Sequence, residues 1–229
     1  MAKLIVECCA NSIQSVINGE KGEANRIELC KSLEVGGLTP CYDNILLAKS
    51  LIQIPIYVLI RPREGDFIYS NTEFKQITSD IKFCKKAGCD GVVIGMLKKD
   101  GSINKEQCKQ SVNIAKPMHV TFNRAFDEAN DLVEDLEDVI ACGCDTLLTA
   151  GQETNVNLGF DNLKKLVRIS AGRINILAGS GVNHKNAESL YKIGIRNFHL
   201  SGSKKNKTDE LETDTLLIKA IINKLKQIV

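Results

Sequence analysis

Residues 3–9 read KLIVECC and residues 26–30 read RIELC, two short apolar runs that each contain a carboxylate and end in a cysteine. Amphipathic stretches with helical spacing alternate with further apolar runs along the rest of the chain. Alternation of strands with helices is typical of a parallel sheet covered by helices. The sequence therefore predicts an α/β protein.

The pattern predicts eight strands, each followed by a helix. The expected strands are Lys3–Cys9, Arg26–Cys30, Ile56–Arg61, Gly91–Gly95, His119–Asn123, Thr146–Thr149, Arg173–Ala178 and Asn197–Ser201. The expected helices are Asn11–Gly19, Asn44–Ile52, Glu73–Ala87, Lys105–Ala115, Leu132–Cys142, Leu158–Ser170, Lys185–Ile193 and a last one from Asp209 onward. Eight such units in 229 residues fit a closed (β/α)₈ TIM-type barrel better than an open doubly wound sheet. No linker or shift of composition divides the chain, so we expect residues 1–229 to form a single barrel domain.

The composition indicates a globular protein with few candidate macromolecular partners. Hydrophobic residues make up 43% and charged residues 25% of the chain. The formal net charge of +2 is too small to indicate a nucleic-acid partner or a membrane surface. The longest apolar runs, such as Ile54–Ile60, are far shorter than the roughly 20 residues of a membrane-spanning helix. We therefore expect neither nucleic acid nor membrane as a partner.

The chain contains nine cysteines, an unusually high number. Residues 1–9 lack the apolar segment and cleavage site of a signal peptide, which favours a cytoplasmic location with reduced thiols. A reduced cysteine is most often a small buried apolar residue. We expect this structural role for Cys84, Cys89, Cys108, Cys142 and Cys144, whereas Cys41 follows the second strand on the side of the strand ends.

Two cysteines share a strand face with a carboxylate. Side chains alternate between the faces of a strand, so Glu7 lies with Cys9 and Glu28 lies with Cys30, while Cys8 points to the opposite face. Adjacent strands are about 4.8 Å apart. If the first two strands pair in matching register, Cys9 and Cys30 become neighbours at the mouth of the barrel.

Other polar residues also gather at the carboxyl ends of the strands, where barrel proteins place their sites. One face of the fifth strand carries His119, Thr121 and Asn123, and one face of the eighth carries Asn197, His199 and Ser201. The candidates for acid–base chemistry are Glu7, Glu28, Asp66 and Asp127. The candidates for binding an anion are Arg61, Arg63, Arg124, Gly179, Gly181 and Ser201, the last three in the loops where barrels often bind phosphate. Tight turns require glycine in any case, so these glycines have a structural explanation as well.

A series of longer motifs recurs in chain order. They are Glu7–Ser12 (ECCANS), Arg26–Cys30 (RIELC), Gly36–Pro40 (GGLTP), Ile60–Arg63 (IRPR), Gly65–Phe67 (GDF), Asp90–Val93 (DGVV) and Val120–Asp127 (VTFNRAFD). In combination these motifs resemble the signatures of the CutC family of copper homeostasis proteins. The resemblance runs from the first strand to Phe198 and His199 near the end, and so covers nearly the whole chain.

The resemblance implies a TIM-type barrel, a cytoplasmic location, self-association as a homo-oligomer, with a dimer expected, and a role in copper handling. It also implies that Cys9 and Cys30 are the Cu(I) ligands. Cu(I) is a soft ion that prefers thiolate, and a nearby Arg61 or Arg63 is expected to lower a thiol pKa. The family usually has histidine where this chain has Asn123, which is neither a general base nor a typical copper ligand.

Two functions remain open on the sequence. In the first, the protein binds Cu(I) through the cysteines at the barrel mouth. In the second, it is an enzyme that acts on a small anionic molecule, for example a phosphorylated one, through the arginines and carboxylates at the strand ends. A metal site made of two thiolates does not require the carboxylates and arginines that the sequence places at the mouth. These additional polar residues keep the enzymatic function open.

Overall fold

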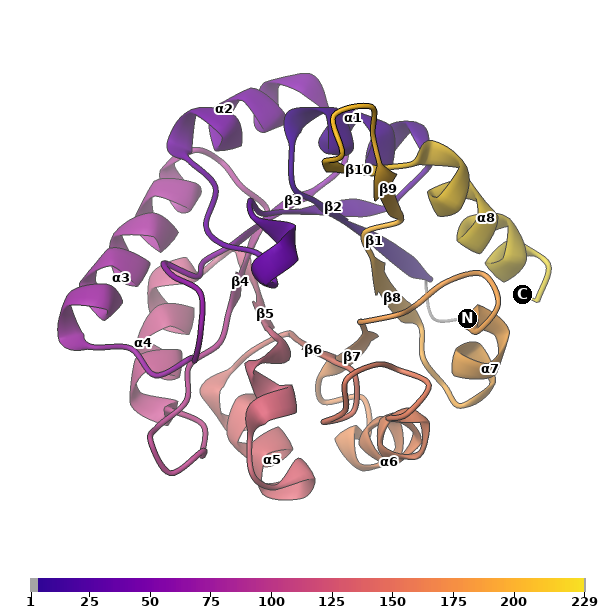
Figure 1. Cartoon of the computed structure of the whole chain (residues 1–229). Helices are drawn as coiled ribbons and strands as arrows, with labels where there is room; N and C mark the ends of the chain where they lie inside the picture. Colours follow the sequence, from indigo (N-terminus) through magenta and orange to yellow (C-terminus); the bar gives the residue numbers. More distant parts are fainter. Residues whose placement is uncertain (1–3, 229) are drawn as a thin grey trace.

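Eight parallel strands close into a barrel, and helices surround it (Figure 1). The computed structural model describes residues 4–228. Each strand pairs with the next along the chain, and β8 pairs with β1 to close the sheet. The strands are β1 (Ile5–Ala10), β2 (Arg26–Leu29), β3 (Ile56–Leu59), β4 (Gly91–Ile94), β5 (His119–Phe122), β6 (Thr146–Thr149), β7 (Asn175–Ala178) and β8 (Asn197–Leu200). The predicted (β/α)₈ barrel is confirmed.

The helices begin at residues that can satisfy their first backbone N–H groups. Ser12 caps α1, Ser70 forms a capping box with Glu73 at α3, and Asp131 caps α5. The helices are α1 (Ile13–Lys21), α2 (Tyr42–Leu51), α3 (Asn71–Lys86), α4 (Lys105–Ala115), α5 (Leu132–Cys142), α6 (Phe160–Ser170), α7 (Ala187–Lys192) and α8 (Thr215–Lys226). Their order agrees with the sequence pattern, and α4 and α5 agree residue by residue.

The two faces of the sheet have different chemistry. Outward side chains such as Val6, Cys8 and Ile27 pack with the helices in one large apolar core. Inward positions carry buried polar side chains, among them Glu7, Arg26, Glu28, Thr121 and Thr146. A buried charge is costly unless it is paired, so the charged side chains inside the barrel need partners as well as apolar packing.

Some predicted boundaries are wrong by a few residues. The third strand ends at Leu59 rather than Arg61, because the backbone N–H of Arg61 donates to Thr39 Oγ1 (2.8 Å) instead of to a neighbouring strand. The seventh strand begins at Asn175 rather than Arg173. Lys3 and Val229, which belong to the first and last predicted elements, lie outside the described residues.

The predicted last helix begins at Thr215 instead of near Asp209, because a hairpin comes first. Strands β9 (Ser203–Lys205) and β10 (Leu211–Thr213) pair antiparallel beside α1 at the mouth (Figure 1). Thr213 anchors the hairpin: its Oγ1 donates to the Ser201 carbonyl (3.1 Å), and its N–H donates to Ser15 Oγ (3.1 Å). The hairpin therefore forms part of the rim around the strand ends.

We expect the packing of Phe122 to make a large contribution to stability. This side chain is fully buried between β5 and the helices. Phe122→Ala should lower the free energy of unfolding by about 3–5 kcal/mol, because it leaves a cavity in a close-packed core. Urea unfolding measures the change. Leu158→Ala, at a side chain 66% exposed, is the control and should change it by less than about 0.5 kcal/mol; equal losses in the two variants would contradict the expectation.

Candidate functional site

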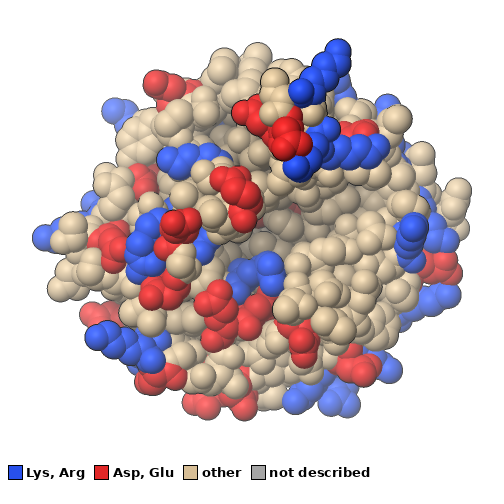
Figure 2. Space-filling model, viewed as in Figure 1, with Lys and Arg blue, Asp and Glu red and all other residues tan. Residues whose placement is uncertain are grey.

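A cavity of about 690 Å³ opens at the carboxyl ends of the strands. The space-filling view shows it as a hollow near the middle of this face, with acidic and basic side chains around it (Figure 2). Its walls come from nearly every strand end in the barrel. The lining includes Cys9, Glu28, Arg61, Asn123, Arg124, Asp127, Glu128, Glu153, Ser180, Gly181, His199, Ser201 and Gly202.

The two thiols that strand alternation places together are neighbours. Cys9 Sγ lies 3.7 Å from Cys30 Sγ, and Cys9 lines the cavity while Cys30 is buried behind it. The hydrogen bond with Cys30, burial and the nearby Glu28 raise the pKa of Cys9 well above its usual range. The expectation that Arg61 or Arg63 lowers the thiol pKa is therefore wrong for Cys9.

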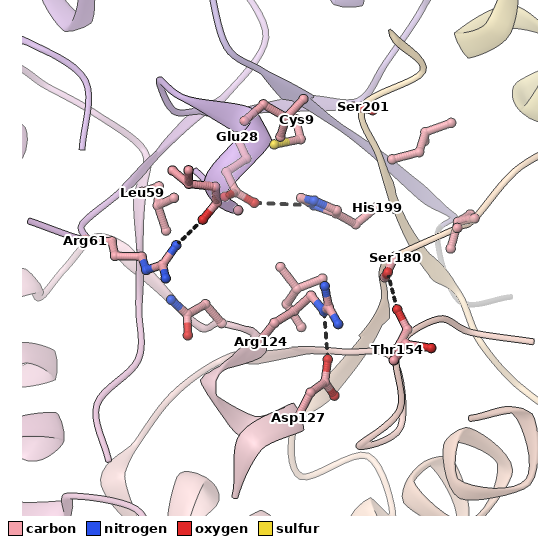
Figure 3. A pocket seen from close by; sticks show the side chains of 18 of the residues that line it. Cys9, Glu28, Leu59, Arg61, Arg124, Asp127, Thr154, Ser180, His199 and Ser201 are labelled. Carbon is pink, nitrogen blue, oxygen red and sulfur yellow. Dashed lines mark hydrogen bonds and ion pairs between the residues drawn. The ribbon is translucent and has the colours of Figure 1, made fainter. Parts of the chain in front are cut away.

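A histidine and a glutamate complete this corner of the cavity. One ligand atom each from Cys9, Glu28 and His199 lies within 4.8 Å of the others, and Figure 3 shows the three side chains converging. Sulfur, carboxylate oxygen and imidazole nitrogen are all metal-binding groups in proteins. This corner thus offers a donor set for a metal ion.

Beneath this corner, Glu7 joins two cationic side chains inside the barrel. Glu7 is fully buried; Arg26 Nε donates to its Oε2, and His199 Nδ1 lies 2.7 Å from its Oε1. Burial alone would raise the pKa of Glu7, but the charge of Arg26 and the hydrogen bond with His199 outweigh it and hold the pKa at about 2. Glu7 is therefore ionised and occupied by its partners, so it is not free to act as a base.

Glu28 differs from Glu7 because it has no cationic hydrogen-bond partner. Its Oε2 is buried without a hydrogen-bond donor in the described chain, although it lies 3.3 Å from His199 Nδ1. Burial raises the pKa of Glu28 to about 7, with the charge of His199 opposing that rise and the charge of Glu7 adding to it. Burial would lower the pKa of His199, but Glu28 and Glu7 raise it, so we assign His199 as the protonated partner.

Arg61 and Asp127, two predicted site residues, line the cavity, but most of their polar atoms form hydrogen bonds that stabilise the surrounding loops. Arg61 donates to the carbonyls of Val35 (2.8 Å) and Gly65 (2.7 Å). Asp127 accepts hydrogen bonds from Thr149 Oγ1 (2.5 Å) and from backbone N–H groups of the loop after β6. Asp127 also accepts from Arg124 Nε at 2.7 Å. A carboxylate with so many donors is suited to positioning Arg124 rather than to removing a proton.

The structure does not bring Arg63 and Asp66 to the cavity wall. Arg63 Nη2 pairs with Asp66 Oδ1 (2.8 Å), and Arg63 Nε donates to Glu73 Oε1 (2.5 Å) at the start of α3. Gly179 also stays out of the lining, yet it matters for packing. A Cβ at Gly179 would lie 2.5 Å from Leu148 Cδ1 and 3.3 Å from His199 Cδ2, so glycine permits the imidazole to lie close to β7.

Asn123 stands where the resemblance leads us to expect histidine, and it has a local structural role. Its Oδ1 accepts the backbone N–H of Ala125 (2.9 Å) and so caps the short 3₁₀ helix Arg124–Glu128. The side chain also fills the space over Gly95, where a Cβ would lie 1.8 Å from Asn123 Oδ1. This asparagine positions the loop that carries Arg124.

His199 is the residue that the sequence reasoning left out of its site candidates. The pattern did place it on the same face of the eighth strand as Ser201. Closure of the barrel brings His199 beside Glu7, because the two residues are paired in register across β8 and β1. A polar residue beside the first strand's glutamate is then expected to contact it.

The remaining cysteines lie away from the cavity. Cys108 Sγ lies 3.8 Å from Cys144 Sγ, and Cys142 Sγ contacts the Lys105 carbonyl at 3.8 Å; the three side chains are buried and do not line the cavity. Cys41 is exposed at the start of α2 and does not line the cavity.

Comparison with known proteins agrees with this architecture. The sequence pattern of the CutC family matches residues 4–204. The chain belongs to the CutC family. It is 43% identical over 203 residues to a CutC family protein of Bacteroides fragilis, which covers 88% of this chain and 81% of the relative. It is 39% identical over 198 residues to the human copper homeostasis protein cutC homolog, covering 86% of this chain and 72% of the relative.

A crystal structure from the same family has a similar fold. The putative copper homeostasis protein CutC from Streptococcus agalactiae superimposes with a TM-score of 0.82 at 28% sequence identity. The match covers 86% of this chain and 98% of the other. None of the helices within residues 4–228 combines the length and the apolar composition that a membrane crossing requires.

We expect Glu7→Gln to destabilise the CutC barrel strongly. The change leaves Arg26 and His199 buried without their anionic partner, which costs about 3–5 kcal/mol. Urea unfolding of the metal-free protein measures the loss. Glu137→Gln, which removes a surface ion pair with Arg173, is the matched control and should change stability far less. Similar losses in both variants would argue against a structural role for the buried carboxylate.

The raised pKa of Glu28 predicts a stability difference that depends on pH. Because the folded state binds this proton more tightly than the unfolded chain, the wild type loses stability as the pH rises from about 4.5 to about 7. Glu28→Gln cannot ionise, so it should gain roughly 1–3 kcal/mol relative to the wild type over that interval. Unfolding free energies of the metal-free proteins at several pH values test this. A difference that is constant with pH would show that Glu28 titrates normally.

Proposed function

We propose that the chain binds Cu(I) through the thiolates of Cys9 and Cys30. The observation that carries this proposal is the 3.7 Å separation of the two sulfur atoms at one corner of the cavity. Metal–thiolate bonds are about 2.3 Å long, so two thiolates on one ion lie no more than about 4.6 Å apart. Both cysteines can therefore reach one ion without movement of the backbone.

The surroundings of the pair suit a soft ion that arrives from the cavity. Cys9 opens to the cavity and Cys30 packs among Leu33, Leu59 and Val93. An apolar wall on one side limits the number of hard ligands, and thiolate selects Cu(I) over harder ions. Because the hydrogen bond with Cys30 and burial raise the pKa of Cys9, metal binding has to release its proton and should be tighter at higher pH.

The relatives support the same function. The human relative is a copper homeostasis protein cutC homolog, and we infer that this chain also takes part in copper homeostasis. The nine cysteines are free, and a thiol pair that binds metal has to stay reduced, which favours the cytoplasm as the site of action. The homodimer expected from the family resemblance stays a prediction.

Cu(I) titration against a competing chelator tests the assignment. The reduced wild type should bind one Cu(I) per chain, and Cys9→Ala/Cys30→Ala should lose at least about tenfold in affinity, because both thiolate bonds are removed. Cys108→Ala/Cys144→Ala is the matched control, since it removes another buried pair with a similar sulfur separation of 3.8 Å. Retention of the wild-type affinity by Cys9→Ala/Cys30→Ala would refute the proposal.

A further inference from the structure

Copper alone does not explain the size of the cavity. A volume of about 690 Å³ lies within the range of small-molecule sites, whereas a metal ion needs only its ligands. Among the described residues that line the cavity, Cys9 is the only cysteine, so the thiol pair occupies one corner. Most of the wall is formed by the loops after β5, β6, β7 and β8 and remains to be explained.

The loops after β7 and β8 offer hydrogen-bond donors that no protein group uses. Within residues 4–228, no backbone or side-chain acceptor pairs with the N–H groups of Gly181, Val182 and Gly202, and all three residues line the cavity. The preceding residue, Ser180, is held at a φ of +74°, and its hydroxyl donates to the Thr154 carbonyl at 2.7 Å. The donors of Gly181 and Val182 therefore belong to a turn that is held in place, a pattern suited to an anionic group.

Arg124 supplies a positive charge next to these donors. Its Nε donates to Asp127, and its Nη2 makes a long contact of 3.5 Å with the Glu153 carbonyl, so Nη1 and the second hydrogen of Nη2 are left for a ligand. Figure 3 shows this guanidinium in the middle of the cavity, between Arg61 and Ser180. Arg61 contributes less, because its terminal nitrogens donate to main-chain carbonyls. A carboxylate can accept paired hydrogen bonds from Arg124.

Negative charge lies beside Arg124 as well. Glu128 and Glu153 line the cavity and form no ion pair among residues 4–228. The Glu153 carbonyl is 3.5 Å from Arg124 Nη2, so the acidic and basic parts of the wall are adjacent. A purely anionic ligand such as a phosphate would be repelled by these carboxylates. A ligand that carries both carboxylate and ammonium groups matches both signs of charge.

We propose that the cavity binds a small thiol that carries carboxylate and ammonium groups and that this thiol delivers Cu(I) to Cys9. The carboxylate would lie against Arg124 and the free N–H groups, and the ammonium group against Glu128 and Glu153. The thiol end would then face the corner formed by Cys9, Glu28 and His199. The thiol group and the delivery step rest on the proposed copper function, whereas the binding of the carboxylate and ammonium groups does not.

The transfer is a ligand exchange without oxidation or reduction. The bond between copper and the carrier sulfur breaks, and bonds from copper to Cys9 Sγ and Cys30 Sγ form. The two cysteine thiols lose two protons; the released carrier thiolate takes up one, and solvent takes the other. Copper remains Cu(I) throughout. The open side of Cys9 explains how the incoming ion reaches a pair whose other sulfur is buried.

Calorimetry with reduced glutathione as the probe, in metal-free protein and under reducing conditions, tests the binding. The wild type should bind glutathione and also S-methylglutathione, because recognition rests on the charged groups. Arg124→Gln should weaken binding at least about tenfold through loss of a charge-assisted hydrogen bond. Glu128→Gln/Glu153→Gln should also weaken it. Arg168→Gln, at an exposed site on α6, is the matched control and should bind as the wild type does.

Two outcomes would overturn the proposal. One is no measurable binding of glutathione by the folded wild type at millimolar concentration. The other is binding of inorganic phosphate that depends on Arg124 without binding of glutathione, which would assign the cavity to a phosphorylated ligand. Cys9→Ala/Cys30→Ala should still bind glutathione but no longer accept copper from the Cu(I)–glutathione complex. If this double variant binds glutathione and still accepts copper as the wild type does, Cys9 and Cys30 are not the copper ligands. That result would contradict the copper function alone and leave the binding of glutathione intact.

Discussion

The ionised carboxylate of Glu7, enclosed by Arg26 and His199, is the interaction on which the mouth of the barrel depends. It joins β1, β2 and β8, the strands on either side of the point where the sheet closes. An unpaired charge at this depth would be too costly to keep, so the three side chains have to be present together. Their pairing also fixes the imidazole of His199 beside Glu28 and Cys9, and so sets the geometry of the corner formed by these three side chains.

The fold and the thiol pair could both be predicted from the sequence because they follow from local periodicity. Strand alternation with period two assigns Cys9 and Cys30 to the inner face and Cys8 to the helices, and the structure agrees. The β9–β10 hairpin could not be predicted in the same way. Its strands are short, and it is fixed by Thr213, whose partner Ser15 lies at the other end of the chain.

The polar residues of the loops were harder to assign, because their partners come from other elements. Arg63 and Asp66 look like site residues beside Arg61, but Glu73 at the start of α3 draws Arg63 away from the cavity. Asp127 looks like a free carboxylate until the loop after β6 supplies its donors. Chain position places such residues near the mouth. Only tertiary contacts decide which of them face the cavity.

The two buried cysteine pairs have nearly the same spacing, and other features distinguish the pair that we propose as a metal site. Cys9–Cys30 and Cys108–Cys144 have sulfur separations of 3.7 and 3.8 Å, which are nearly equal. They differ in access and in neighbours: Cys9 opens to a large cavity beside Glu28 and His199, whereas the other pair is enclosed by helices. A thiol pair can exchange an ion only if a carrier can approach it. The cavity is therefore as much a part of the proposed copper function as the sulfur atoms.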